Sequence, residues 1–448
     1  MVHLFTINNC HIALDVHSGA VHILDDIAFA ILTGSSTDKF LEKEIAEAEK
    51  EIETLKASGQ LFSKPAANFK EAEIDLTQNR PKIVKSMCLH IAHDCNLRCK
   101  YCFAGEGDYG AVSRALMPPE VGKKAIDFLI DNSGTRRNLE VDFFGGEPTL
   151  NFDTVKIIVK YARQRGAEEN KNFRFTFTTN GLLLDDEKIE YINQNMDNVV
   201  LSLDGRKEVN DNMRRSLDKS ASCYDKVLPK FQQLTEARNH QNYYVRGTYT
   251  RENLDFGSDV LHIAGLGFSQ ISVEPVIGLP EASYSIRKED IPALCAEYER
   301  LATEMLKRRN GETQKENFNF FHFMLDLEGG PCAAKRITGC GAGTEYLACT
   351  PEGDLYPCHQ FVGDAQFCLG NLDSSIIQTD WQEQFAQCNV YSKPECDACW
   401  AKYFCSGGCA ANAFHMHGDI MKVDETGCEL QKKRMECALY LLANSLSD

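Results

Sequence analysis

Long apolar runs are absent from this chain. No stretch of its 448 residues approaches the roughly 18 consecutive apolar residues that a membrane span requires. The start, MVHLFTINNCHIALDVHSG, lacks a basic segment followed by a long apolar core, so we expect no secretion signal and a cytoplasmic location. Positively charged residues are outnumbered: the chain has 48 Lys and Arg and 65 Asp and Glu, so its formal net charge is −17. This balance argues against a nucleic-acid partner held by phosphate contacts.

Cysteine, by contrast, is abundant. The chain has 19 cysteines, and in the absence of a secretion signal they indicate metal or redox chemistry rather than disulfides. Twelve of them fall between Cys332 and Cys437, which core packing alone does not explain. The length of the chain suggests two to four domains.

Cys95, Cys99 and Cys102 lie in the run HDCNLRCKYC, directly after a short apolar stretch. Three thiols at this spacing can hold one cubane iron–sulfur cluster and leave its fourth iron without a protein ligand, whereas such clusters normally take four cysteines. The spacing resembles the signature of the radical S-adenosylmethionine (SAM) superfamily. The resemblance implies that the open iron binds the amino and carboxylate groups of SAM, and that one electron then releases a 5′-deoxyadenosyl radical. A zinc knuckle or a redox thiol group is the alternative.

Strands and helices alternate six times between residues 86 and 310, which indicates βαβ units and a parallel sheet. Six repeats resemble the open, partial (β/α)6 barrel of radical SAM enzymes, an α/β fold. In barrels of this kind the chemistry gathers at the carboxyl ends of the strands. The predicted strands are Met87–Ala92, Leu139–Phe144, Phe173–Thr179, Val199–Asp204, Tyr243–Thr250 and Gln270–Val276.

Glycine and short polar residues follow several of these strands. The adjacent Gly145 and Gly146 let a ligand approach the backbone closely, and with Glu147 they resemble the GGE motif that contacts the amino group of the SAM methionine. Ser202 and Asp204 point the same way if their strand stays regular.

An arginine completes the expected SAM site. Arg214 resembles the family's carboxylate-binding arginine, and a planar guanidinium suits that task. Its neighbour Arg215 is the competing candidate, and an exposed salt bridge is the alternative for Arg214. By resemblance Tyr101 lies beside the adenine and Val276 borders the base. The cofactor-binding residues that the resemblance implies are Tyr101, Gly145, Gly146, Glu147, Asn180, Ser202, Asp204, Arg214 and Val276.

The second group of cysteines has the spacing C-x2-C-x5-C-x3-C from residue 396, followed by Cys428, with C-x12-G-x4-C upstream from residue 340. It resembles the SPASM extension, which holds two auxiliary 4Fe–4S clusters; a pair of structural zinc sites is the alternative. The segment 346–358 reads as a hairpin that returns Cys358 to Cys340.

The resemblance also implies how these cysteines divide. The outer cluster takes Cys396, Cys399, Cys405 and Cys428. The inner cluster takes Cys340, Cys358 and Cys409, which leaves it one ligand short. Either Cys332 or Cys349 closes it, or the position stays open for a substrate thiol.

Residues 1–80 read as a separate unit of strands followed by helices, and they resemble the winged-helix domain whose edge strand pairs with a leader peptide. A structural cap or a dimerisation module is the alternative. Charged, poorly periodic residues 69–85 read as a linker. The expected layout is 1–80 recognition domain, 81–310 barrel, 311–331 bridge, 332–428 SPASM domain and 429–448 C-terminal helix.

This layout resembles enzymes that modify ribosomally made peptides, and it looks closest to the thioether-forming maturases of six-cysteine (SCIFF) peptides. The resemblance implies three 4Fe–4S clusters, SAM, a precursor peptide whose leader binds the N-terminal domain, and an external low-potential donor of the flavodoxin or ferredoxin type. The alternatives are a sulfatase-maturing, formylglycine-forming enzyme and, in another class, a non-enzymatic iron–sulfur carrier or zinc scaffold.

Overall fold

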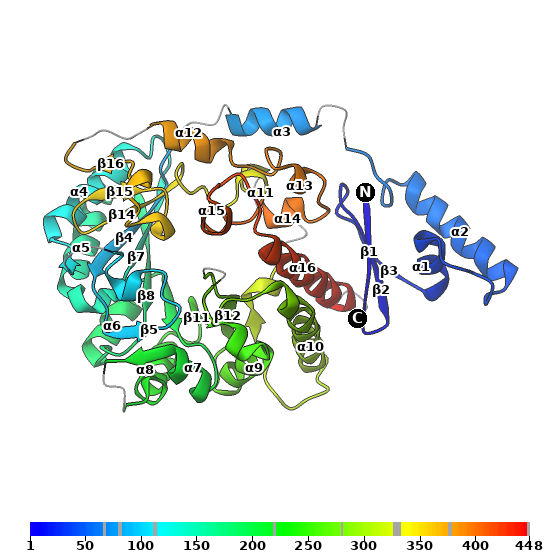
Figure 1. The fold of residues 1–448 in the computed structure, drawn as a ribbon, viewed down its shortest axis with the longest axis horizontal. Helices are drawn as coiled ribbons and strands as arrows, with labels where there is room; N and C mark the ends of the chain where they lie inside the picture. Colours follow the sequence, from blue (N-terminus) through cyan, green and yellow to red (C-terminus); the bar gives the residue numbers. More distant parts are fainter. Residues whose placement is uncertain are drawn as a thin grey trace.

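The computed structural model describes residues 1–65, 69–78, 83–110, 114–217, 221–278, 281–325, 333–374 and 379–445 (Figure 1). All six predicted barrel strands form, and each pairs in parallel with the next. They are β4 (Ser86–His93), β7 (Asn138–Gly145), β8 (Asn172–Thr179), β9 (Asn198–Ser202), β11 (Tyr243–Tyr249) and β12 (Gln270–Pro275).

Helices cover the outer face of this sheet, and the core lies between the two layers. Phe143, Phe175 and Phe177 alternate with more exposed residues along β7 and β8 and are almost completely buried. The rings of Phe143 and Phe175 stack with their centroids 5.8 Å apart. The covering helices are α4 (Pro119–Asp131), α5 (Phe152–Glu168), α6 (Asp186–Asn195), α7 (Lys207–Met213), α8 (Cys223–Ala237), α9 (Phe256–Gly265) and α10 (Ile291–Arg309).

The sheet continues beyond both ends of the predicted barrel. The expected hairpin is confirmed as β14 (Tyr346–Cys349) and β15 (Asp354–Tyr356). β14 also pairs in parallel with β4, and β16 (Gly370–Asn371) adds to β15. At the other end β13 (Asn319–Phe320), from the bridge, pairs with β12. The cysteine-rich segment therefore extends the barrel sheet.

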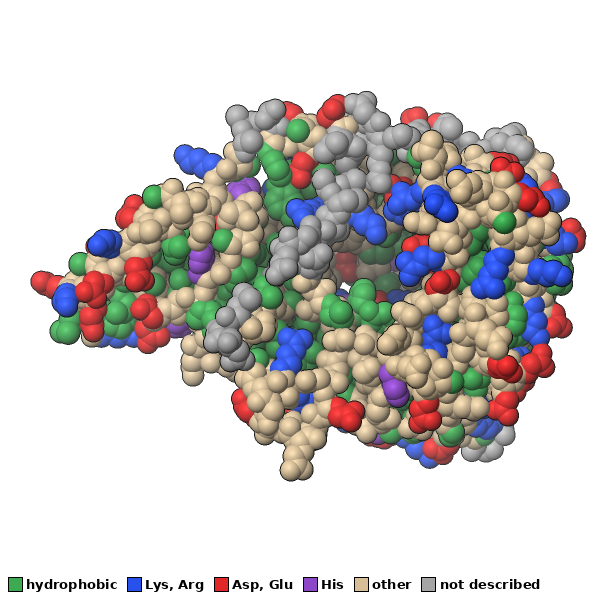
Figure 2. All heavy atoms as spheres, turned by 180° about the vertical axis from the view of Figure 1, so that it is seen from behind, with side chains coloured by type: hydrophobic (Ala, Val, Ile, Leu, Met, Phe, Trp, Pro, Cys, Tyr) green, Lys and Arg blue, Asp and Glu red, His purple; other side chains and the backbone are tan. Residues whose placement is uncertain are grey.

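The N-terminal unit is a three-stranded antiparallel sheet with two helices. The expected strands form as β1 (Val2–Ile7), β2 (Cys10–Asp15) and β3 (Val21–Leu24), and β2 pairs with both of the others. The helices are α1 (Asp26–Thr33) and α2 (Glu42–Ala57). Seen from behind in Figure 2, this unit projects from the body as an arm with charged side chains at its tip, where α2 carries a run of exposed glutamates.

The linker predicted at residues 69–85 is wrong over its first part, because Phe69–Gln78 form helix α3. Contacts with the cysteine-rich segment stabilise this helix. Lys70 Nζ lies 2.6 Å from a carboxylate oxygen of Asp397, and Tyr391 donates a hydrogen bond to Glu73. Figure 1 shows α3 lying across the top of that segment, beside α12.

The C-terminal helix α16 (Glu425–Ser445) begins four residues before the predicted start and packs between α10 and the N-terminal sheet (Figure 1). His3 of β1 lies 2.9 Å from the Glu436 carboxylate, and the Arg434 Nε donates to the Tyr298 hydroxyl of α10 at 2.7 Å. No helix among the described residues combines the length and apolar character needed to cross a bilayer.

Shorter elements complete the described chain. The remaining strands are β5 (Leu97–Cys99), β6 (Ala115–Leu116) and β10 (Arg214–Ser216). The helices of the cysteine-rich segment are α11 (Ala333–Thr338), α12 (Thr379–Gln387), α13 (Pro394–Asp397), α14 (Lys402–Cys405) and α15 (Ala410–His417). Short 3-10 helices lie at Gly105–Gly107, Pro148–Asn151, Arg251–Asn253, Lys288–Asp290, Phe321–Phe323, His359–Phe361 and Ala365–Phe367.

Candidate functional site

A cavity of about 210 Å³ lies at the carboxyl ends of the barrel strands. All three cysteines of the first motif line it, and so does every predicted cofactor-binding residue except Asp204. The shared lining residues are Cys95, Cys99, Tyr101, Cys102, Gly145, Gly146, Glu147, Asn180, Ser202, Arg214 and Val276. Residues that are far apart in the sequence thus meet at the edge of the sheet where ligands bind in such barrels.

A short two-stranded ribbon positions the cysteine loop. β5, which contains Cys99, pairs antiparallel with β10, and Arg214 lies directly opposite Cys99. Three-residue strands leave no readable alternation, so this pairing was not predictable from the sequence. The ribbon brings Arg214, rather than its exposed neighbour Arg215, to the cavity wall.

The three thiols lie in an environment that suits a shared metal centre. Burial raises the pKa of Cys95 to about 12, with Glu147 and the Cys102 thiol adding to the shift, and burial likewise raises the pKa of Cys99. A bound metal would offset this penalty, because it deprotonates the thiols that ligate it. A Cβ on Gly107 would lie 2.7 Å from the Cβ of Cys95, so only glycine permits this close approach.

Thiolate donors suit an iron–sulfur cluster. Among the described residues no three Cys, His, Asp or Glu side chains converge closely enough to hold a single metal ion. Cys95, Cys99 and Cys102, which line one cavity, have the donor chemistry that such a cluster takes.

Arg214 is part of a buried charged group. Its Nη2 lies 3.0 Å from Asp204 Oδ1, and the Tyr101 hydroxyl donates to the other Asp204 oxygen at 2.6 Å. Burial lowers the pKa of Arg214, but the Asp204 carboxylate outweighs this effect and keeps that pKa well above its ordinary value. The Nε of Arg214 is buried and has no hydrogen-bond partner among the residues that the structure describes. Asp204 thus lies behind the cavity wall and orients Arg214 and Tyr101.

A regular strand would place the side chains of Ser202 and Asp204 on the same face, but only Ser202 lines the cavity. β9 ends at Ser202, which lines the cavity, whereas Asp204 is fully buried and accepts a hydrogen bond from the Thr248 backbone N–H at 3.0 Å.

The glycine pair allows the second strand end to lie against the cysteine loop. A Cβ on Gly146 would collide with the Asp94 carbonyl oxygen, and Gly145 has a φ of 119°. Glu147 is buried and accepts hydrogen bonds from the Thr179 hydroxyl at 2.8 Å and the Asn180 backbone N–H at 2.7 Å. This carboxylate therefore joins the ends of β7 and β8 at the cavity.

Further lining residues were missed in the sequence. Arg246 and Thr248 are two residues apart on β11 and both line the cavity, and Arg246 Nη2 lies 3.0 Å from Glu274 Oε2 on β12. Their spacing of two residues along one strand was the sequence signal that could have identified them. His359 and Gln360 enter the same cavity from the cysteine-rich segment, and only the pairing of β14 with β4 brings them there.

The auxiliary cysteines act on one another electrostatically in two sets. Cys340 and Cys409 each raise the pKa of Cys358, although burial has the larger effect, so these three thiols are neighbours. In the outer group the pKa of Cys428 is raised to about 12 by burial first and then by Cys405 and Cys396. Cys399 lies by Cys396 and Cys405 and completes that group.

The fourth ligand of the inner group differs from one expectation. Cys349 is fully buried, its thiol donates to the Thr350 carbonyl at 3.5 Å, and its electrostatic neighbours are Asp354 and Glu352 rather than the inner thiols. Cys332 lies outside the described residues. Cys388, which fits no sequence pattern, lies near Cys340.

A larger cavity of about 610 Å³ adjoins the first. Both are lined by residues 274–277, at the end of β12 and just beyond it, which therefore form a common wall. Cys409 of the inner group and Cys405 and Cys428 of the outer group line the larger cavity. Arg434 lies in its wall, and its buried Nη2 has no hydrogen-bond partner within the described part of the chain.

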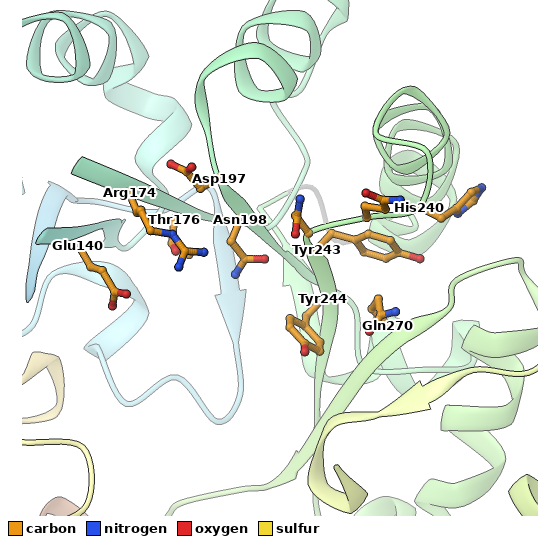
Figure 3. Close-up of a pocket in the computed structure, with 11 residues that line it drawn as sticks. Glu140, Arg174, Thr176, Asp197, Asn198, His240, Tyr243, Tyr244 and Gln270 are labelled. Atoms are coloured by element: carbon orange, nitrogen blue, oxygen red, sulfur yellow. The ribbon is translucent and has the colours of Figure 1, made fainter. Parts of the chain in front are cut away.

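A third cavity, of about 520 Å³, lies at the opposite, amino ends of the strands (Figure 3). Polar side chains such as Glu140, Arg174 and Asn198 line it, and none of the predicted site residues does. The predicted site residues therefore lie apart from this cavity.

Comparisons with known proteins show what the chain is similar to. Residues 89–252 match the family model of the Radical SAM superfamily. The chain is 22% identical to the radical SAM cyclopropyl synthase TigE of Paramaledivibacter caminithermalis over 366 residues, which are 78% of this chain and 72% of that protein. It is also 22% identical to the cysteine-type anaerobic sulfatase-maturating enzyme of Clostridium perfringens, over 70% of this chain and 85% of that enzyme.

Solved structures share the fold. Native anSMEcpe with bound AdoMet has a TM-score of 0.66 and 19% identity, and the match covers 80% of this chain and 99% of that one. Streptococcus suis SuiB bound to the precursor peptide SuiA has a TM-score of 0.55 and 17% identity, over 95% of this chain and 98% of that one.

Proposed function

We propose that this chain, a radical SAM superfamily enzyme by its residues 89–252, installs a thioether between a cysteine sulfur and the α-carbon of another residue in a ribosomally made peptide. The observation that carries the proposal is the common wall at residues 274–277. It separates a cavity lined by the three-cysteine motif from a larger one lined by auxiliary cysteines, so a substrate in the larger cavity lies next to both.

The residues of the smaller cavity would hold and orient the cofactors. Cys95, Cys99 and Cys102 would ligate a 4Fe–4S cluster, which together with bound SAM supplies a 5′-deoxyadenosyl radical. Arg214, fixed by Asp204, presents a guanidinium to the SAM carboxylate. The protein's part in such chemistry is orientation and the exclusion of competing reactions.

Aromatic rings close the side of this cavity next to the cysteine-rich segment. The centroid of the His359 ring lies 5.6 Å from that of the Phe103 ring and 5.2 Å from that of the Phe144 ring. All three residues line the cavity. This cover would limit the access of water to a reactive radical.

The auxiliary cysteines would handle the sulfur of the substrate. Cys340 and Cys409 both act on Cys358, whereas the charges that act on Cys349 are those of Asp354 and Glu352, and this supports an inner cluster with a position open to a substrate thiol. A metal-bound thiol is deprotonated and ready to form a carbon–sulfur bond. Cys409 lies in the wall of the larger cavity, where that thiol would enter.

The N-terminal unit would bind the leader of the precursor peptide. β3 is an edge strand, and its Ile23 is 48% exposed, so it can accept an added strand. The structural match to SuiB bound to its precursor peptide extends over nearly the whole chain, including this unit. An external donor of the flavodoxin or ferredoxin type would supply the electrons.

A second candidate function is the maturation of sulfatases by oxidation of Cys or Ser to formylglycine. The likeness to the Clostridium perfringens enzyme supports it. It calls for complete cysteine ligation of both auxiliary clusters and makes no use of a leader-binding unit.

Mass spectrometry of the peptide product tests the proposal. Incubation of the reconstituted enzyme with SAM, reductant and precursor peptide should remove two hydrogens from the peptide and block one of its cysteines from alkylation. A formyl group in the product would favour the second candidate. An unchanged peptide alongside active SAM cleavage would contradict the thioether proposal.

A further inference from the structure

Lys393 is buried in the cysteine-rich segment, with a relative exposure of only 1%. Lysine is almost never fully buried unless it is paired. Here the ammonium group donates one hydrogen bond, to the Gly407 carbonyl oxygen at 3.1 Å. Within the described part of the chain no carboxylate lies within ion-pair distance of it.

The neighbours of this ammonium group are cysteine sulfurs from both auxiliary groups. The Gly407 carbonyl that accepts its hydrogen bond lies two residues from Cys405 of the outer group and two residues from Cys409 of the inner group. The backbone carbonyl of Lys393 accepts a hydrogen bond from the Cys396 N–H of the outer group at 3.0 Å. Lys393 also lines a small cavity together with Cys340 of the inner group and with Cys388. The lysine therefore lies between the two groups.

Burying a cation is costly unless negative charge compensates for it. A backbone carbonyl and neutral thiols compensate only in part. Thiolate-ligated iron–sulfur centres carry net negative charge, so two such centres on either side would supply what the described side chains do not.

We propose that Lys393 is a positioning residue whose charge is shared by both auxiliary centres and raises the reduction potential of each. This inference rests on the proposed function, since it requires that the two cysteine groups hold iron–sulfur clusters. Each electron added to a centre makes it more negative by one unit, and a nearby fixed cation favours that change. Net charge and hydrogen bonds to the sulfurs are among the factors that set such potentials.

The test is a potentiometric titration of the reconstituted full-length protein with dithionite, followed by electron paramagnetic resonance. Lys393→Gln keeps a donor for the Gly407 carbonyl but removes the charge. We expect it to lower the midpoint potential of both auxiliary signals by the equivalent of at least a tenfold change in the oxidised-to-reduced ratio, about 59 mV for a one-electron couple. The signal of the SAM-binding cluster should stay in place.

Two variants serve as controls. Lys393→Arg keeps the charge and should leave the auxiliary potentials near those of the wild type. Lys402→Met removes another lysine of the same segment, one that lies 3.6 Å from its Asp397 partner, and should leave them unchanged.

Each outcome decides the matter. Fully loaded Lys393→Gln with unchanged potentials would overturn the inference. If Lys393→Gln loses iron while Lys393→Arg retains it, the charge is required to hold the centres, which supports the inference. Equal iron loss in both variants would overturn it. A wild-type protein that takes up only about four irons would instead refute the cluster assignment beneath it.

Discussion

At the residue scale, one carboxylate organises the wall of the cofactor cavity. Asp204 accepts the Tyr101 hydroxyl with one oxygen and pairs with Arg214 through the other. A buried charge is stable only with such a partner. This arrangement holds the Arg214 guanidinium in one orientation. Its Nε has no hydrogen-bond partner among the described residues.

Arg214→Lys should therefore weaken SAM binding at least tenfold, because a lysine cannot pair with Asp204 and present a planar fork at the same time. Isothermal titration of the reconstituted enzyme with SAM measures the change. Arg215→Lys is the matched control, since Arg215 is exposed and does not line the cavity. Equal losses in the two variants would show that Arg214 has no special role.

Motif spacing predicted the residues of this site better than it predicted their individual roles. The cysteines and the glycine pair lie where their patterns indicate, because each pattern spans a single loop. Asp204 lies outside the cavity because β9 ends before it. His359 lies inside it through a strand pairing between distant segments, which no local pattern reveals.

At the scale of elements, Asp15 closes the N-terminal unit. The carboxylate at the end of β2 is fully buried and accepts hydrogen bonds from the Ser18 backbone N–H at 2.9 Å and the Ser63 backbone N–H at 2.9 Å. Burial raises the pKa of Asp15, but these bonds outweigh it and lower that pKa to about 2. Asp15 thus ties the segment after α2 to the sheet.

This shift makes the stability of the unit depend on pH. The pKa of Asp15 is lower in the folded than in the unfolded state, so its contribution is fully present above about pH 4 and is lost as the pH falls towards 2. Asp15→Asn should cost about 2 kcal/mol at pH 7, since one pKa unit corresponds to about 1.4 kcal/mol. It should cost much less at pH 2.

Hydrogen exchange of the β2 amides at the two pH values measures this difference in stability. Asp38→Asn, at an exposed position of the same unit, is the control. Equal protection of the β2 amides in wild type and Asp15→Asn at pH 7 would contradict the assignment.

The long elements followed from their own sequence patterns, whereas several short ones did not. The six barrel strands and the two N-terminal helices have clear patterns that match their burial. β3 has four residues, β5 has three, and each is defined by its partner strand rather than by its own sequence. α3 was predicted to be a linker, and it is stabilised by contacts with Asp397 and Tyr391.

At the scale of the whole molecule, the three cysteine groups predict the metal content. Reconstituted protein should bind about twelve irons per chain, as three clusters of four. The triple variant Cys95→Ala, Cys99→Ala, Cys102→Ala should retain about eight, because the auxiliary groups lie on separate elements. It should also lose every spectroscopic response to SAM.

Iron analysis and electron paramagnetic resonance with and without SAM measure both quantities. Loss of all iron in the triple variant would mean that the three sites do not load independently. A SAM response that survives in it would place the cofactor elsewhere.

The pairing of β4 with β14 has a consequence for biosynthesis. Ser86 and Tyr346 are partners in the sheet, yet about 260 residues separate them, which a ribosome adding 5–20 residues per second needs about 10 to 50 seconds to translate. During that interval the edge of β4 that later pairs with β14 lacks this partner strand, and unpaired strand edges promote aggregation. Nascent chains truncated before β14 should therefore depend on chaperones, and the cysteine-rich segment should be difficult to transplant as an independent module.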